Sequence, residues 1–222
     1  MGKIWYLSPS NQKANLGVGS YGSEKAQMNL LLDEIIPHLD RAGVSFHRGD
    51  PDMSIQQRAA ESNSMGACFH LALHSNAGGG GKARGPIAFY DSNESKAFSA
   101  SLIEALLSLG QTNNRAQNVQ KNTSFYELRC TNAPACLLEV DFHDSIAGVE
   151  FLINRRSDIA QAIAQVIIEA DGKEFVPQTG GEYVDEAIKL GFFPVGTTWD
   201  APLTKEEAAV LAVKLLNLCK RG

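Results

Sequence analysis

The fold is decided by the stretch FHLALHSNA at residues 69–77, which four glycines follow at 78–81. Its apolar residues indicate a buried strand, and the glycines indicate a loop directly beyond it. His74 therefore stands at the end of the predicted strand. Open α/β sheets place their binding and catalytic groups at this edge, so we expect a functional site there.

Two further segments combine an apolar run with polar residues at its end. Residues 134–140, PACLLEV, set Glu139 into the end of an apolar run, and residues 3–12, KIWYLSPSNQ, break at a proline into a polar loop. That loop leads to Ser23, a predicted helix N-cap that puts Glu24 in the first turn of a helix. A buried carboxylate is costly unless a cation or a hydrogen-bond network holds it, which favours a functional role for Glu139.

Strand-like runs alternate with helical patterns along most of the chain. The predicted strands lie near residues 3–8, 44–47, 67–74, 86–90 and 134–140. The predicted helices lie near residues 24–41, 53–65, 94–109 and 157–170. This alternation predicts an α/β fold, with a mostly parallel twisted sheet and helices on both faces.

The composition changes after residue 172. We expect a first domain over 1–172, a linker over 173–181 because of its turn-forming residues, and a small helical module over 182–222. A unit of about forty residues forms only a marginal core by itself. The module is therefore expected to pack on the first domain, to bind a second copy of the chain as a homo-oligomer, or to bind a target surface.

Charge and hydrophobicity exclude several classes of protein. The net charge of -5 over 222 residues, without a basic cluster, argues against nucleic-acid binding. No apolar run is long enough to span a membrane, and the apolar run near the N-terminus is too short for a signal-peptide core. We therefore expect synthesis in the cytoplasm. The four cysteines lack the paired spacing of a zinc finger or a redox motif.

Two histidines of the central stretch have different expected roles. On a strand, His70 and His74 share a face but lie ~13 Å apart at ~3.3 Å per residue, so they cannot bind one ion. His74 is the candidate ligand because it stands beside the glycine loop. We expect His70 to be a hydrogen-bonded core residue.

The candidate residues form a donor set typical of a catalytic zinc site. It comprises Glu24, His74, Glu139 and His143, the last of which follows the strand of Glu139 and can turn back toward it. Zn²⁺ in such a site lowers the pKa of a bound water and polarises a carbonyl group, while a glutamate that is not a ligand moves the proton.

Five segments together resemble the zinc-dependent N-acetylmuramoyl-L-alanine amidases of the type 3 fold, found in bacterial autolysins and phage endolysins. The segments are SP at 8–9, GSEK at 22–25, LHSNA at 73–77, YELR at 126–129 and PACLLE at 134–139. The resemblance covers about residues 3–170. It implies that Glu24 and His74 are zinc ligands and that Glu139 is the catalytic glutamate.

The chain departs from the family pattern at one ligand. The family's first ligand, a histidine, falls on Asn11, and an amide is a poorer zinc donor than an imidazole. We expect His143 to replace it, because the family usually has an apolar residue at that position. Asn11, Gln12 and water are the alternatives that remain open.

The resemblance implies peptidoglycan as the partner. The expected reaction is hydrolysis of the amide between the lactyl group of N-acetylmuramic acid and the L-alanine of the stem peptide. It also implies a phage-type lysin that a membrane-permeabilising partner releases to the wall. We expect Asn11, Asn76 and Arg129 to contact substrate, Arg129 by pairing with a stem-peptide carboxylate. The alternatives are an inactive peptidoglycan-binding module and a zinc carboxypeptidase or endopeptidase.

Overall fold

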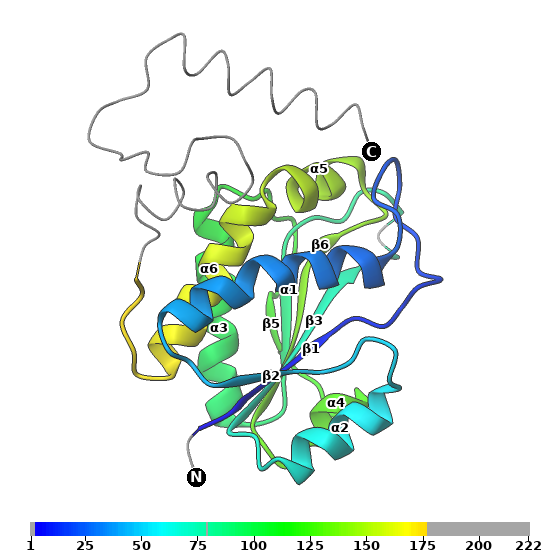
Figure 1. The fold of residues 1–222 in the computed structure, drawn as a ribbon. Helices are drawn as coiled ribbons and strands as arrows, with labels where there is room; N and C mark the ends of the chain where they lie inside the picture. The colour runs from blue at the N-terminus through cyan, green and yellow to red at the C-terminus, as the bar shows by residue number, and fades with distance from the viewer. Residues whose placement is uncertain (1–2, 79, 177–222) are drawn as a thin grey trace, which may run out of the picture. The chain divides into compact units, whose positions relative to one another are not determined.

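The computed structural model describes residues 3–78 and 80–176, and their centre is a six-stranded sheet (Figure 1). The strands are β1 (Trp5–Pro9), β2 (Phe46–Arg48), β3 (Phe69–Asn76), β4 (Ile87–Tyr90), β5 (Val119–Lys121) and β6 (Ala135–Phe142). The helices are α1 (Glu24–Arg41), α2 (Ile55–Ser64), α3 (Asn93–Ser108), α4 (Tyr126–Arg129), α5 (Ile146–Asn154) and α6 (Arg156–Ala170). The prediction of an α/β fold is confirmed.

The strand order is β2-β1-β3-β6-β4-β5, and the sheet is mostly parallel as predicted. Strands β2, β1, β3 and β6 run in the same direction, whereas β4 is antiparallel to β6 and parallel to β5. The carboxyl ends of β1, β3 and β6 therefore meet at one edge of the sheet. The short strand β5 was not predicted, because three residues are too few to give an alternating pattern.

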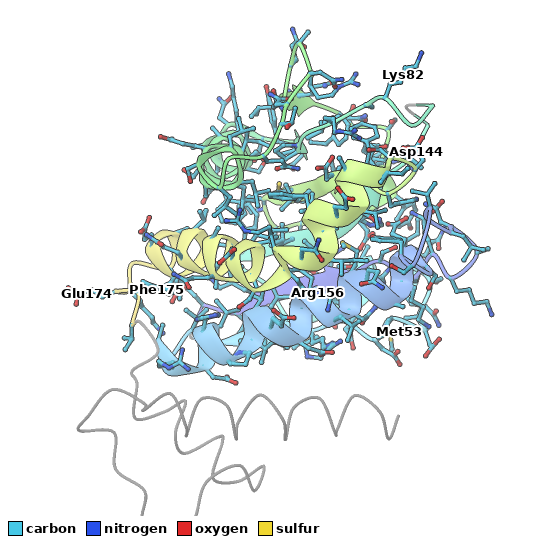
Figure 2. All side chains as sticks on the ribbon, turned by 90° about the horizontal axis from the view of Figure 1, so that it is seen from above. Met53, Lys82, Asp144, Arg156, Glu174 and Phe175 are labelled. Carbon is cyan, nitrogen blue, oxygen red and sulfur yellow. The ribbon has the colours of Figure 1, made fainter. Side chains whose placement is uncertain are left out.

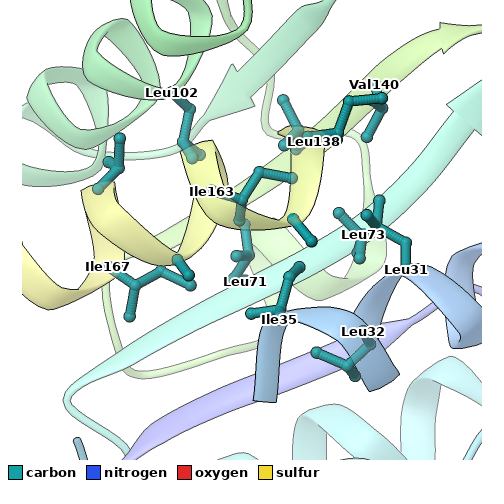
Figure 3. Packing of buried hydrophobic residues seen from close by; sticks show 14 of the residues in the cluster. Leu31, Leu32, Ile35, Leu71, Leu73, Leu102, Leu138, Val140, Ile163 and Ile167 are labelled. Carbon is teal, nitrogen blue, oxygen red and sulfur yellow. The ribbon is translucent and has the colours of Figure 1, made fainter. Parts of the chain in front are cut away.

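Helices cover both faces of the sheet (Figure 1). On one face, apolar side chains of α1, α3 and α6 pack on those of β3 and β6 and form the main core (Figure 3). Leu31 and Ile35 come from α1, and Ile163 and Ile167 come from α6. All four are almost completely buried, which fixes α1 and α6 side by side across the strands.

The opposite face carries α2 and α4 and is more polar. Its small apolar cluster contains Ala72 of β3, Leu137 of β6 and Leu128 of α4. Beside it, the buried His70 Nε2 lies 3.1 Å from Glu127 Oε1, which also accepts a hydrogen bond of 2.5 Å from Ser8 Oγ. His70 is thus a hydrogen-bonded core residue, as its position in the sequence predicts.

The beginnings of two helices bear on the site. The Ser23 hydroxyl caps α1 as predicted, accepting a hydrogen bond of 3.2 Å from the backbone N–H of Ala26. At the start of α6, Arg156 donates to Gln27 Oε1 at 2.6 Å and so ties α6 to the first turns of α1 (Figure 2). The first turn of α1, which carries Glu24, is therefore held at both ends.

The chain divides into two units, Met1–Val176 and Pro177–Gly222. The predicted linker begins at residue 173, but Lys173 and Phe175 contact the first unit: Lys173 Nζ donates to Gly43 O, and the Phe175 ring stacks on His38 at 5.7 Å. The predicted module at 182–222 lies outside the described residues. Within the part of the chain that is described, no helix is both long and apolar enough to cross a membrane.

Candidate active site

A pocket of about 230 Å³ opens where the carboxyl ends of β1, β3 and β6 meet. Its polar wall includes Asn11, Gln12, His74 and Glu139, and its other walls are formed by Ile55, Phe125, Tyr126, Glu127 and Leu137. The residues thus come from the loop after β1, from the ends of β3 and β6, and from the segments of α2 and α4. This is the edge at which the sequence predicts the site.

His74 lines the polar wall of the pocket and contacts Glu24. Glu24 Oε1 lies 2.7 Å from His74 Nδ1, and both side chains are buried. Burial alone would raise the pKa of Glu24, but hydrogen bonds from His74, Ser10 and Asn15 outweigh it and hold the pKa below its usual value. For His74, burial lowers the pKa, and the hydrogen bond with Glu24 and the charge of Glu139 reverse that effect.

Glu139 stands beside His74, because the two residues are paired in the register of β3 and β6. Its Oε2 is buried and has no hydrogen-bond partner, and His74 Nε2 is likewise buried without a partner. Burial raises the pKa of Glu139 to about 7, although the charge of His74 opposes the rise. A carboxyl group with this pKa can both take and release a proton near neutral pH.

Asn11 and Gln12, at the start of the loop after β1, direct their side-chain amides to different partners. Gln12 Nε2 lies 3.4 Å from His74 Nδ1, the same nitrogen that faces Glu24. Asn11 donates from Nδ2 to the backbone oxygen of Met53 at 3.0 Å. Of these two residues, Gln12 is therefore the one whose amide reaches His74.

His143 lies on another side of Glu24, and the structure does not bring it together with His74. Its Nδ1 is 2.8 Å from Ser75 Oγ, and its Nε2 is 3.2 Å from Asn15 Oδ1. Asn15 Nδ2 in turn donates to Glu24 Oε2 at 2.6 Å. The predicted role of His143 as a direct ligand therefore has no support in this arrangement, since both ring nitrogens have other partners.

The position of His143 follows from an irregularity at the end of β6. On a regular strand, His143 would share a face with Glu139, because residues two and four apart point the same way. The pairing changes from His74 with Glu139 to Asn76 with Phe142, so that one extra residue lies in β6. A one-residue shift exchanges the faces beyond it, and His143 accordingly lies on the face of Ser75.

The donor set can be compared with what a metal ion requires. In the described part of the chain, no group of three or more His, Cys, Asp and Glu side chains is placed to hold a metal ion. Glu24 Oε1 and His74 Nδ1 are nevertheless two strong donor types that lie 2.7 Å apart, and the Gln12 amide lies 3.4 Å from the same nitrogen. The residues therefore fit a divalent cation with two strong donors and one weaker donor.

The remaining predicted substrate residues lie at different distances from the pocket. Arg129 is exposed, and its guanidinium carbon lies 5.8 Å from the centre of the Tyr126 ring, which forms part of the pocket wall. Asn76, at the end of β3, accepts a hydrogen bond of 2.8 Å from the N–H of Ala77. Arg129 thus lies next to a residue that lines the pocket, whereas the Asn76 side chain is engaged with its own loop.

Three residues of the site were missed in the sequence. Asn15 contacts both Glu24 and His143, and Tyr21 and Ser75 continue the same chain, with Tyr21 OH 2.5 Å from Ser75 Oγ. Polar residues in a glycine-containing loop are common, so no pattern distinguishes Asn15. For Ser75, its position directly after His74 was the one available signal of a place in the site.

A profile of the Amidase_3 family, described as N-acetylmuramoyl-L-alanine amidase, matches residues 17–169, which is more than half of the chain. The chain therefore belongs to the Amidase_3 family. The match begins beyond Asn11 and Gln12. It includes the positions of Glu24, His74 and Glu139.

Individual members of the Amidase_3 family are similar over most of the described chain. The N-acetylmuramoyl-L-alanine amidase CwlM of Bacillus licheniformis is 26% identical over 166 residues, which are 72% of this chain and 64% of CwlM. The chain therefore spans less than two thirds of the length of that relative.

Solved structures show the same fold. The catalytic domain of CwlV, an N-acetylmuramoyl-L-alanine amidase from Bacillus (Paenibacillus) polymyxa, has a TM-score of 0.66 at 20% identity, over 75% of this chain and 97% of that chain. An N-acetylmuramoyl-L-alanine amidase from Clostridium difficile 630 has a TM-score of 0.66 at 19% identity, over 76% of this chain and 96% of that chain.

Proposed function

We propose that the protein is a peptidoglycan hydrolase that cleaves the amide between N-acetylmuramic acid and the L-alanine of the stem peptide. The observation that carries this proposal is the arrangement of Glu139 beside the pair of His74 and Glu24, at the mouth of a pocket in an Amidase_3 fold. Peptidoglycan is then the partner, and the cell wall is the place of action.

The proposed cofactor is Zn²⁺, which Glu24 and His74 would hold. When bound, the ion would supply an acidified water and polarise the amide carbonyl. Glu139 is the proton carrier in this proposal, because its Oε2 is free of other partners and its pKa of about 7 suits both uptake and release. It would take the proton of the attacking water and deliver it to the leaving nitrogen of L-alanine.

The wall of the pocket suggests how the substrate is oriented. Phe125 and Tyr126 add aromatic side chains to the lining of the pocket. Arg129, beside the Tyr126 ring, is placed to pair with a carboxylate of the stem peptide outside the pocket. The guanidinium group would hold the peptide, and the polar wall would act on the amide.

The proposal extends to the arrangement of the chain and to its release. We propose that residues 182–222 form a module that binds the wall or a second copy of the chain. We also propose that a membrane-permeabilising partner releases the protein to the wall, as for a phage-type lysin.

Mass spectrometry of digested peptidoglycan tests the function. Purified protein should release intact stem peptides with a free L-alanine amino group and leave the glycan strands whole, and removal of metal by a chelator should stop the release. Cleavage inside the stem peptide would instead indicate a carboxypeptidase or endopeptidase. Binding to walls without any product would indicate an inactive binding module.

A further inference from the structure

We propose that Gln12 supplies the third protein donor of the metal site, and that His143 is a positioning residue that holds Glu24 through Asn15. This inference rests on the proposed metal site. It assigns roles in the metal site to Gln12, His143 and Asn15, and the contacts of each residue are given below.

The first observation is the crowding at one nitrogen. His74 Nδ1 faces Glu24 Oε1 at 2.7 Å and Gln12 Nε2 at 3.4 Å. A nitrogen without a metal cannot donate to the carboxylate and accept from an amide N–H at once. A half-turn of the Gln12 amide exchanges its oxygen and nitrogen, and coordinates alone rarely distinguish the two. With the oxygen inward, a cation at this point would receive three donor atoms.

The second observation fixes the proton positions around His143. Glu24 accepts only, so Asn15 must turn its Nδ2 toward Glu24 and its Oδ1 toward His143. His143 Nε2 must then carry a proton and donate to Asn15. Burial also lowers the pKa of His143, which favours the neutral ring.

The hydrogen bonds at the other ring nitrogen of His143 are consistent with this tautomer. With Nε2 protonated, the neutral ring presents a lone pair at Nδ1, which accepts from Ser75 Oγ. Ser75 in turn accepts from Tyr21 OH, and the Tyr21 ring stacks on His143 at 5.3 Å. Neither nitrogen of His143 is then left with a free lone pair for an ion.

The hydrogen bonds from His143 through Asn15 therefore hold Glu24 at the carboxylate oxygen that does not face His74. Asn15 binds Glu24 Oε2 and leaves Oε1 directed at His74. Outer residues of this kind orient metal ligands, and their loss costs ~10- to 100-fold in metal affinity. The Asn11 side chain contacts Met53, to whose backbone oxygen its Nδ2 donates, whereas the Gln12 amide contacts His74.

Isothermal titration of the full chain with Zn²⁺ tests the role of Gln12. Gln12→Ala should weaken zinc binding by at least ~10-fold, since it removes a direct donor, and Gln12→His should bind more tightly than the wild type because imidazole is the better zinc donor. Asn11→Ala is the matched control and should keep wild-type affinity. Unchanged affinity in Gln12→Ala would overturn the assignment.

A double-mutant cycle tests the role of His143. If His143 acts through Asn15, the single variants His143→Ala and Asn15→Ala should each weaken zinc binding. The zinc affinity of the double variant should then be no lower than that of the single variant with the lower affinity. Independent, additive losses would show that His143 binds the ion directly. His143→Gln, whose amide can still donate to Asn15, should restore part of the affinity.

These measurements separate the inference from the proposed function. Zinc binding is titrated without substrate, so a protein that needs Gln12 for zinc but releases no stem peptide would support the site and refute the activity. If the wild type releases stem peptide and Gln12→Ala binds zinc as tightly as the wild type does, the inference is refuted and the activity is not. Circular dichroism of each variant, with a spectrum and an unfolding midpoint equal to those of the wild type, would show that a loss of zinc binding is not a loss of fold.

Discussion

His74 and Glu139 lie opposite each other on the neighbouring parallel strands β3 and β6, each near the carboxyl end of its strand. The backbone hydrogen bonds of the sheet therefore set the spacing of the two side chains. One of them faces Glu24, and the other has a buried oxygen without a partner. This relationship separates the residue that would hold an ion from the residue that would carry a proton.

Replacement of the proton carrier should stop turnover without removing the metal. Glu139→Gln keeps the shape of the side chain but cannot accept a proton, so the rate of stem-peptide release should fall ~10²- to 10⁴-fold. Zinc content should stay at the wild-type level. Glu150→Gln, on the exposed side of α5, is the control. An activity above about a tenth of the wild type would contradict the role, given the range for general-base catalysis.

The buried pair of Glu127 and His70 should make stability depend on pH. Burial raises the pKa of Glu127, but His70, Arg58 and Ser8 outweigh it, and the pKa in the folded state is lowered. The stabilisation is therefore present above the unfolded-state pKa, about 4.3, and is lost as the pH falls through the lower folded-state value.

Urea unfolding at several pH values measures this effect. Glu127→Gln should lower the free energy of unfolding at pH 7 by ~3–5 kcal/mol, because it leaves the buried charge of Arg58 without this nearby carboxylate. The variant should also lose less stability than the wild type below pH ~4. Parallel pH profiles for the two proteins would show that Glu127 is not the titrating group.

Gly17 should tolerate no side chain. An added Cβ would lie 2.4 Å from Cδ1 of the Tyr21 ring and 2.8 Å from the backbone oxygen of His143. Gly17→Ala should therefore destabilise the protein by ~1–3 kcal/mol through overpacking. The exposed neighbour Leu16 gives the control Leu16→Ala, which should leave the free energy of unfolding nearly unchanged. Equal unfolding midpoints for the two variants would contradict the close packing.

Arg129 should contribute to substrate binding rather than to chemistry. Arg129→Ala should raise the KM for wall fragments by about tenfold, since a charge-assisted hydrogen bond is worth ~1.5–3 kcal/mol, and leave kcat near the wild-type value. Lys96→Ala is the matched control, because Lys96 also lies over a tyrosine ring, that of Tyr90 at 6.0 Å. A fall in kcat without a change in KM would contradict the assignment.

A chain that ends at residue 176 should fold and keep its zinc affinity. Trp5 Nε1 donates to Asp171 Oδ1 at 3.0 Å, and Phe175 stacks on His38, so an earlier end would remove contacts of the first unit. If residues 177–222 bind the wall or a second copy, the shortened chain should lose wall binding or change its mass in light scattering. No change in either property would refute both roles.

The sequence allowed most of the fold to be predicted because its signals are local. The apolar runs at β1, β3 and β6 and the cap at Ser23 are each read from a few neighbouring residues. These elements bring Glu24, His74 and Glu139 to one edge, as predicted. The contacts of Gln12 and Asn15 could not be predicted, because they depend on how an irregular loop folds back on the sheet.

The contacts of His143 could not be predicted for a different reason. Alternation along a strand predicts faces correctly only while the register is constant. The shift between His74 and Asn76 has no signature in the residue types on either side of it. His143 was expected in the loop after the strand, turned back toward the pocket of Glu139, and its ring lies beside Ser75.

The irregularity in β6 also has an evolutionary consequence. A substitution changes one side chain, but gain or loss of a single residue between Glu139 and Phe142 would exchange the sides of everything that follows in the strand. His143 would then be carried to the pocket side without any change in its identity. Chain length at this point is thus a means by which a histidine can pass between binding an ion and supporting a neighbour that binds it.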